Sequence, residues 1–376
     1  MNIGIVCYPT FGGSGVVATE LGIGLAEKGH NVHFITYAQP VRLKPFFPRI
    51  YYHEVNPLKY DLFEYAPYEI ALASKLVNVC RHDNLDVIHV HYAIPHAAAA
   101  YFAQQILNDQ GLHVPLITTL HGTDITLVGK DESYAPVVEF SINKSNGITT
   151  VSESLKQETL GQFNINKPIQ VIPNFIDFER FRKYDKSHFK KAICPNGEKL
   201  IIHVSNFRKV KRIPDILKVF KKVIQVTPAK LFLIGDGPER TKAERLCRDL
   251  GICDDIRFLG KQTAIEELMA VGDAFILPSE KESFGLAALE AMACELPVIA
   301  TNTGGLPEVI DHDKNGFLSP VGDIDSMSRN MISLFKNEKM LLDFKRSALD
   351  KAKLFDIQYI LPKYEQFYQS IIKSNS

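Results

Sequence analysis

The 376-residue sequence has no excess charge of either sign, because 43 Lys and Arg residues balance 43 Asp and Glu residues. Such a chain offers no strongly basic surface, so we expect neither nucleic acid nor an anionic membrane as a partner. No stretch approaches the ~20 apolar residues of a membrane span, and the start shows no charged leader with an apolar run. The six cysteines include no C-x-x-C pair, which excludes a zinc framework and fits a reducing cytoplasm.

The chain is long for one hydrophobic core, so we expect two domains. Apolar runs typical of buried strands alternate with helical patterns, and this alternation predicts an α/β fold with parallel, doubly wound sheets. The runs are residues 3–7, 32–36, 87–90, 114–119, 147–151 and 169–172, followed by 200–204, 230–234, 274–278 and 298–301. Pro173 and Asn174 break the pattern, which places the boundary between domains 1–172 and 173–356 there.

The most informative stretch is residues 279–293, SEKESFGLAALEAMA, directly after the strand predicted at 274–278. Gly285 stands where a turn would tighten, and strong helix formers begin at Leu286. A helix N-terminus at the carboxyl end of a parallel strand suits a phosphate. Glu282 and Glu290 flank the turn and can accept hydrogen bonds from sugar hydroxyls, so the stretch favours a nucleotide-sugar. The alternative is that Glu282 caps the helix and Glu290 is a solvated helical residue.

A glycine-rich turn, Gly12 to Gly15, follows the first predicted strand. Gly13-x-Gly15-x-x-Ala18 fits the spacing of a dinucleotide fingerprint. However, the second strand ends at Thr36 without the acid that a NAD ribose requires, so NAD is not expected. The small residues let a ligand approach backbone N–H groups closely, and we expect the turn to flank a ligand in a cleft. The alternative is a tight turn without a ligand.

Four cations lie between Ser205 and Arg212, in a loop from strand to helix, and could clamp a diphosphate. A solvated basic loop is the alternative. Gly235-Asp236-Gly237-Pro238 predicts a tight turn into a helix that starts at Pro238.

Three histidines, His89, His91 and His96, surround the end of another strand, but they lack a nearby cysteine or acid, so a metal is not expected. Instead we expect His89 to be buried and hydrogen-bonded and the other two to line a polar cleft. We expect Tyr92 to offer its hydroxyl to an anionic ligand. Ser152 is expected to cap the next helix.

Residues 41–59 are rich in aromatic, proline and basic residues, including Arg42, Lys44 and Arg49. We expect a long loop or a short hairpin over the mouth of the cleft.

Taken together, these motifs resemble those of retaining glycosyltransferases with the GT-B fold, in which Glu282 and Glu290 form the E-x7-E signature. The resemblance covers nearly the whole chain. Its other matching pieces are residues 12–15, 171–177, 233–239 and 304–308. A narrower resemblance, carried by residues 89–96, 119–124 and 205–212, is to the members that make N-acetylglucosaminyl L-malate in the first step of bacillithiol synthesis.

The resemblance implies two Rossmann-like domains facing across a cleft, with the acceptor on the first and the nucleotide-sugar on the second. A terminal helix, residues 357–376, would cross back to the first domain, and domain closure would exclude water. The implied reaction moves N-acetylglucosamine from UDP-N-acetylglucosamine to the hydroxyl of L-malate. It retains configuration, needs no metal or other cofactor and takes place in the cytoplasm. The oligomeric state stays open, a homo-oligomer included.

The resemblance also implies roles for individual residues. His121 would lie near the donor sugar and the reacting centre, although a loop histidine bonded to backbone is the alternative. In the wider family an Arg and a Lys five residues apart hold the diphosphate; here Asn206 stands where that Arg would be, which makes Arg208 the second cation. The implied catalytic residues are His121, Arg208, Lys211 and Glu282. The implied donor contacts are Gly13, Ser14, Gly15, Asn206, Gln262, Ser283, Phe284, Gly285, Leu286 and Glu290, and the implied acceptor contacts are Ser14, Tyr92 and Thr123.

Other functions remain open on the same fold. A sibling transferase could use a lipid or an inositol phosphate as acceptor. A UDP-sugar epimerase would convert the donor without an acceptor. A non-catalytic nucleotide-sugar-binding protein would bind UDP without turnover, although Glu282, His121 and the basic loop argue against it.

Overall fold

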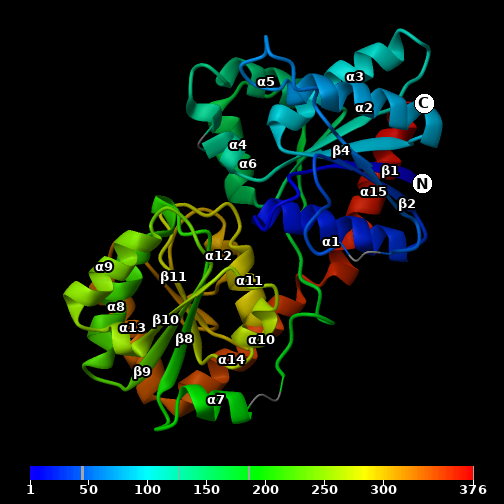
Figure 1. The fold of residues 1–376 in the computed structure, drawn as a ribbon. Helices are drawn as coiled ribbons and strands as arrows, with labels where there is room; N and C mark the ends of the chain where they lie inside the picture. Colours follow the sequence, from blue (N-terminus) through cyan, green and yellow to red (C-terminus); the bar gives the residue numbers. More distant parts are fainter. Residues whose placement is uncertain (44–45, 127, 185–186, 376) are drawn as a thin grey trace. The chain divides into compact units, whose positions relative to one another are not determined.

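The computed structural model describes residues 1–43, 46–126, 128–184 and 187–375. The chain divides into two compact units, which are described separately (Figure 1). Unit 1 comprises Met1–Asn174 and Ile357–Ser376, and unit 2 comprises Phe175–Asp356.

Unit 1 is built on a parallel sheet with the strand order β3-β2-β1-β4-β5-β6-β7. Its strands are β1 (Asn2–Val6), β2 (Asn31–Thr36), β3 (Ile50–Glu54), β4 (Val87–His91), β5 (Leu116–Leu120), β6 (Gly147–Thr150) and β7 (Ile169–Val171). The central strands carry almost only buried side chains, as expected for a sheet with helices on both faces.

Helices cover both faces of this sheet (Figure 1). They are α1 (Gly13–Glu27), α2 (Tyr68–Asp83), α3 (Ala98–Asn108), α4 (Thr123–Thr126), α5 (Ala135–Lys144), α6 (Glu153–Gln162) and α15 (Ile357–Asn375). One apolar cluster joins the sheet to α2 and α3. The terminal helix α15 lies against α1, where Leu361 contacts Gly24, and against β6, where Phe367 contacts Gly147.

Unit 2 repeats the architecture with the parallel strand order β10-β9-β8-β11-β12-β13. Its strands are β8 (Lys199–Val204), β9 (Ala229–Ile234), β10 (Ile256–Gly260), β11 (Ala274–Leu277), β12 (Val298–Thr301) and β13 (Gly316–Ser319). Its helices are α7 (Ser187–Ile193), α8 (Ile213–Ile224), α9 (Arg240–Leu250), α10 (Ile265–Met269), α11 (Leu286–Ala293), α12 (Leu306–Val309), α13 (Ile324–Lys336) and α14 (Glu338–Lys353). The main apolar cluster lies between the sheet and α8, α9, α13 and α14.

The predicted α/β class with two doubly wound parallel sheets is confirmed. Ser152 caps α6 as predicted, because its hydroxyl accepts a hydrogen bond of 3.0 Å from the Leu155 amide. The helix predicted to start at Pro238 instead begins at Arg240, since residues 237–239 form a turn closed by the Arg240 amide on the Gly237 carbonyl.

The prediction of a loop or hairpin at residues 41–59 is wrong for the part that forms β3. This segment is an edge strand parallel to β2, not one arm of a hairpin. Tyr51 and Tyr52 are partly exposed, so the segment lacks the apolar run that marks the buried strands, although its aromatic residues favour β structure. Lys44 lies outside the described residues.

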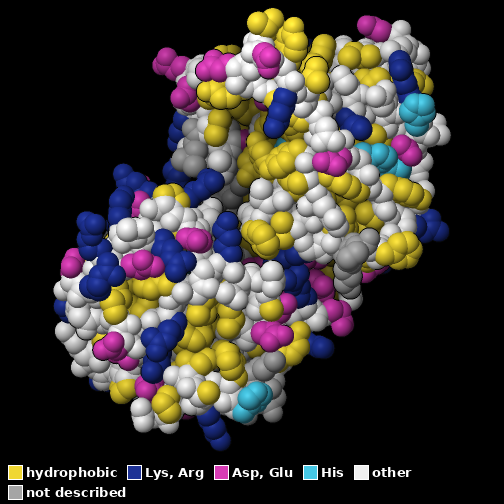
Figure 2. All heavy atoms as spheres, in the orientation of Figure 1, with side chains coloured by type: hydrophobic (Ala, Val, Ile, Leu, Met, Phe, Trp, Pro, Cys, Tyr) yellow, Lys and Arg dark blue, Asp and Glu magenta, His cyan; other side chains and the backbone are white. Residues whose placement is uncertain are grey.

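Large hydrophobic side chains are exposed between residues 46 and 70. Phe46 is 84% exposed, Leu62 82% and Tyr65 81%. Figure 2 shows hydrophobic side chains gathered over parts of unit 1. Among the described residues, no helix is both long and apolar enough to cross a membrane.

We expect Leu361→Ala to lower the free energy of unfolding by about 2–5 kcal/mol, because it removes a buried side chain of α15 that packs against α1. The matched control is Tyr359→Ala on the same helix, where the side chain is 66% exposed and the change should stay within about 0.5 kcal/mol. Urea denaturation followed by circular dichroism measures both. Equal midpoints for the two variants would contradict the packing of α15 on unit 1.

Candidate active site

Three neighbouring strands of unit 1 end next to the residues predicted for the acceptor side. The order β1-β4-β5 places the carboxyl ends of these strands side by side. The glycine turn follows β1, Tyr92 follows β4 directly, and His121 follows β5 directly. Ligands of open α/β sheets bind at such a carboxyl edge, at the point where the strand order reverses.

The glycine turn brings the backbone of α1 close to the loop before it. A Cβ on Gly15 would lie 2.3 Å from the Tyr8 carbonyl oxygen and 2.7 Å from that of Thr10, so no larger residue fits without a shift of the backbone. Gly12 precedes α1 without a side-chain cap, and Gly13 is the first helical residue. The first N–H groups of a helix have no partner within the helix, so this turn suits an anion.

Two of the predicted acceptor contacts, Ser14 and Tyr92, meet directly. The Ser14 hydroxyl donates a hydrogen bond of 3.1 Å to the Tyr92 hydroxyl. Tyr92 has a positive φ of 97°, which a tyrosine adopts only when its surroundings hold it there. Its amide donates to the Thr119 carbonyl at 3.0 Å, and its ring lies 5.5 Å from the ring of His121. The structure therefore groups Ser14, Tyr92 and His121.

His121 belongs to a row of buried histidines. Its Nε2 lies 2.8 Å from Nδ1 of His91, and the two rings are stacked. Within the described residues, the His121 ring thus bonds to another ring and not to a backbone group. Burial lowers the pKa of His121 to about 3, so the imidazole is neutral at pH 7.

The expectations for the other histidines are met in part. His89 is buried and bonds to Tyr368 at 2.7 Å and Thr119 at 2.6 Å, as predicted. The expectation that His91 and His96 line a polar cleft is wrong, since both side chains are fully buried. His91 is the last residue of the central strand β4, and the His96 ring bonds to the His91 carbonyl at 2.6 Å.

Sequence reasoning missed Asp124, which holds the loop after β5. Its carboxylate accepts hydrogen bonds from the amides of Ala93 and Gly122, both at 3.0 Å, and of His121 at 3.3 Å. The residue is 1% exposed, and burial raises its pKa to about 6 against these hydrogen bonds. The sequence offered one signal for this role of Asp124, namely an acid in the first turn of the short helix α4, next to the half-buried Thr123.

In unit 2, the basic loop and the loop after β11 are connected. The ammonium of Lys211 donates to Oε1 of Glu282, which also accepts a 2.8 Å bond from the Ser279 hydroxyl. The Glu280 amide donates to the Val210 carbonyl at 2.8 Å. The structure therefore brings two predicted catalytic residues, Lys211 and Glu282, into one ion pair.

The remaining cations of this loop differ in their surroundings. Arg212 forms an ion pair with Asp215. Arg208 is exposed and has no ion pair within the described part of the chain. It is thus available to an anion without losing a protein partner.

The turn at Gly285 starts α11 as the sequence predicts. Gly285 has a φ of 93°, and a Cβ there would lie 2.5 Å from a Leu306 methyl group. The N-cap residue of α11 is Gly285, and Glu282 bonds instead to Lys211 and Ser279, so the alternative role of Glu282 as the helix cap is wrong. The alternative that Glu290 is solvated is also wrong, because this residue is only 5% exposed.

The other predicted donor contacts lie at different depths. Leu286 and Ser283 are half-buried, whereas Phe284 is 1% exposed and its ring packs against Phe355. Asn206 is exposed, with its carbonyl against Gly237. Gln262 is exposed beyond β10 and donates to the Leu259 carbonyl at 2.6 Å.

The chain has two Rossmann-like units, each built on a parallel sheet. One unit carries a glycine turn, and the other carries a basic loop beside a helix start that is flanked by two acids. These features define the GT-B class of glycosyltransferases. Family models agree. "Glycosyl transferases group 1" matches residues 185–351, and "Glycosyltransferase Family 4" matches residues 11–180.

Comparison with individual proteins gives a more specific similarity. It is 46% identical over 377 residues to N-acetyl-alpha-D-glucosaminyl L-malate synthase of Bacillus anthracis, covering 100% of this chain and 98% of that relative. It is 30% identical over 319 residues to an uncharacterized glycosyltransferase of Methanocaldococcus jannaschii, covering 81% and 80%. The structure of Anabaena HepE in complex with UDP and glucose shares the fold at a TM-score of 0.84 and 20% identity, over 98% of this chain and 100% of that one. The chain belongs to the group 1 and family 4 glycosyltransferases, and it is an enzyme of that class.

Buried histidines make the stability of this chain dependent on pH. Burial lowers the pKa values of His89 and His121 to about 3 and those of His33, His96 and His203 to about 4, and it lowers that of His91 as well. A lowered folded pKa contributes stability that is present above the unfolded value of ~6.5 and is lost as the pH falls toward the folded value.

We therefore expect the free energy of unfolding to fall between pH 7 and pH 5, by up to about 1.4 kcal/mol per pH unit for each histidine, and the thermal midpoint to fall with it. Asp124 opposes this trend, since its pKa is raised and its protonation below about pH 6 favours the folded state. His96→Gln should flatten the slope, whereas His113→Gln at an exposed histidine should not. Calorimetry at several pH values measures the thermal midpoint of the wild type and of both variants. A midpoint that rises toward pH 5 would refute the assignment of neutral buried rings.

Proposed function

We propose that this chain transfers N-acetylglucosamine from UDP-N-acetylglucosamine to the hydroxyl of L-malate, in the first step of bacillithiol synthesis. The observation that carries this proposal is the 46% identity, over the full length, to a relative named for that product. The class of reaction follows from the family; the donor sugar and the acceptor follow from the relative's name.

Unit 2 supplies the residues of the proposed donor side. The start of α11 and the cations Arg208 and Lys211 offer positive charge to the diphosphate. Glu282 would hold hydroxyls of the sugar, and the buried Glu290 would hold the ribose. Asn206, Ser283 and the backbone of residues 284–286 complete this side, with Gln262 near the base.

Unit 1 supplies the residues of the proposed acceptor side. Malate carries two carboxylates, and the hydrogen-bonded hydroxyls of Ser14 and Tyr92 can turn their donors toward one of them. Thr123 is half-buried in the loop after β5 and offers a third hydroxyl. Gly13 and Gly15 offer the backbone of the α1 start, and the neutral His121 ring would contact the sugar.

The proposed chemistry retains configuration and uses no metal. The bond from the anomeric carbon to the UDP oxygen breaks, and a bond from that carbon to the malate hydroxyl oxygen forms on the same face. The hydroxyl proton passes to the leaving phosphate. This route needs no pair of carboxylates flanking the scissile bond, as a retaining hydrolase would.

The deciding experiment measures UDP release from UDP-N-acetylglucosamine in EDTA, with and without L-malate. We expect release that depends on malate and a product with an α linkage by NMR. Release without malate would point to hydrolysis or another acceptor, and no stimulation by malate would remove the acceptor assignment. A β-linked product would overturn the proposed retention of configuration. Loss of activity in EDTA would overturn the proposed independence from metal.

Replacing Lys211 by Ala should lower kcat about 100- to 1000-fold, because it removes one preorganised donor to the leaving diphosphate. The matched control is Lys218→Ala, an exposed lysine of α8 in the same unit, which should leave kcat unchanged. Circular dichroism checks that both variants fold. A loss of less than about tenfold in the Lys211 variant would exclude this lysine as a main stabiliser of the leaving group.

A further inference from the structure

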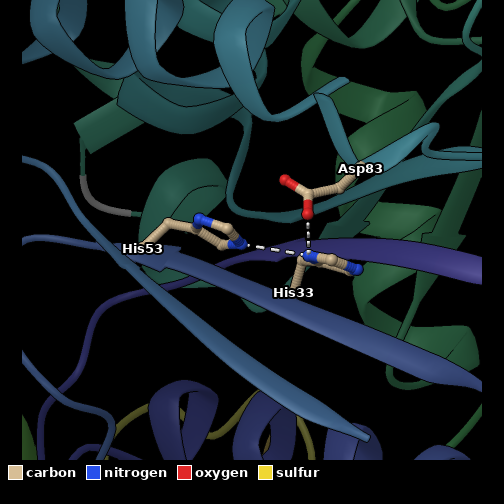
Figure 3. A group of neighbouring side chains, drawn as sticks. All are labelled: His33, His53 and Asp83. Atoms are coloured by element: carbon tan, nitrogen blue, oxygen red, sulfur yellow. Dashed lines mark hydrogen bonds and ion pairs between the residues drawn. The ribbon is translucent and has the colours of Figure 1, made fainter. Parts of the chain in front are cut away.

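Unit 1 contains a group of side chains that can bind a metal ion, and none of them is among the residues proposed for the reaction. His33 in β2, His53 in β3 and Asp83 in the last turn of α2 point toward one another (Figure 3). Nδ1 of His33 lies 3.0 Å from Nε2 of His53 and 4.0 Å from a carboxylate oxygen of Asp83. All three candidate ligand atoms lie within 4.8 Å of one another.

We propose that His33, His53 and Asp83 form a binding site for a divalent transition metal of the zinc type. Two imidazole nitrogens and one carboxylate oxygen match the ligand set of zinc sites that keep one position for water. Bonds of ~2.0–2.1 Å in a tetrahedron separate ligand atoms by ~3.3 Å, and the observed separations of 3.0 and 4.0 Å lie on either side of this value. Mg²⁺ and Ca²⁺ prefer oxygen ligands and fit this set poorly.

The sheet holds the two histidines in place. β2 and β3 pair in parallel with His33 opposite Tyr51 and Ile35 opposite His53, so the two histidines lie two residues apart on one face. The His33 ring is buried and stacks on the Tyr51 ring at 4.7 Å. Such a ring loses little freedom when it binds an ion.

Asp83 and Lys75 are charged side chains that face the two histidines. Asp83 supplies a negative charge; its carboxylate, at 4.0 Å from His33, is too far for a direct hydrogen bond. Lys75 is the cation that faces His53, and it opposes binding in part.

The position indicates a structural role. Asp83 ends α2 four residues before β4 starts, at the amino edge of the sheet, whereas Ser14, Tyr92 and His121 follow the carboxyl ends of strands. A metal here would tie the edge strand β3 to β2 and to α2. It would therefore stabilise unit 1 without entering the reaction.

The test uses the full-length protein without a histidine tag, stripped with EDTA and dialysed. Calorimetric titration with Zn²⁺ should give one site per chain, and Zn²⁺ should raise the thermal midpoint where Mg²⁺ does not. Co²⁺ should give the visible absorption bands of a four-coordinate site. UDP release with malate should be the same with and without Zn²⁺, so the outcome is separate from that of the proposed reaction.

The variants His53→Gln and Asp83→Asn remove ligands that are only partly buried, and each should weaken Zn²⁺ binding by at least about 10- to 100-fold. The matched control is His82→Gln, an exposed histidine next to Asp83 that lies outside the group, and it should bind like the wild type. Absence of a stoichiometric site, unchanged affinity in His53→Gln, or a loss in His82→Gln equal to that in His53→Gln would each overturn the proposal.

Discussion

The parallel pairing of β1 with β4, and of β8 with β11, determines where the residues of the candidate site lie. In each sheet these neighbours are far apart in sequence, so the loops that leave their carboxyl ends turn in different directions and expose the edge between them. Ser14 reaches Tyr92 across 78 residues for this reason, and Lys211 reaches Glu282 across 71 residues. The same topology, used twice, builds two different surfaces: hydroxyls and neutral rings in unit 1, and a pair of opposite charges in unit 2.

The ion pair of unit 2 explains how the Lys211 ammonium can stay charged in a partly buried position before an anionic ligand binds. The side chains of Lys211 and Glu282 are only 20% and 12% exposed, so each charge alone would be poorly solvated. The carboxylate also accepts from Ser279 and keeps a partner if the lysine turns to a phosphate. Arg208 lies beside this pair without an ion pair among the described residues, so a diphosphate would gain its charge without breaking an existing contact.

Sequence reasoning predicted those features that depend on local patterns. Apolar runs predicted the strands except β3, β10 and β13. Gly285 and the helix formers after it predicted α11, and Ser152 predicted a cap. It failed where the pattern was weak or the contact was distant. β3 carries partly exposed tyrosines and has no apolar run. The burial of His91 and His96 depends on packing that forms only in the folded chain. The same holds for the three hydrogen bonds that Asp124 accepts from backbone amides. The group of His33, His53 and Asp83 likewise needs the register of two strands and the end of a helix.

Asp124 and the histidines connect the loops that follow β4 and β5 in unit 1. The Asp124 carboxylate ties Ala93, in the loop after β4, to Gly122 and His121, in the loop after β5. The His91 ring, fixed within β4, then bonds to the His121 ring and restricts its orientation. Since burial lowers the pKa values of both rings, His121 offers a neutral hydrogen-bonding edge and not a positive charge. An uncharged ring of fixed orientation suits a sugar hydroxyl, and it leaves the binding of anionic groups to the hydroxyls and backbone amides nearby.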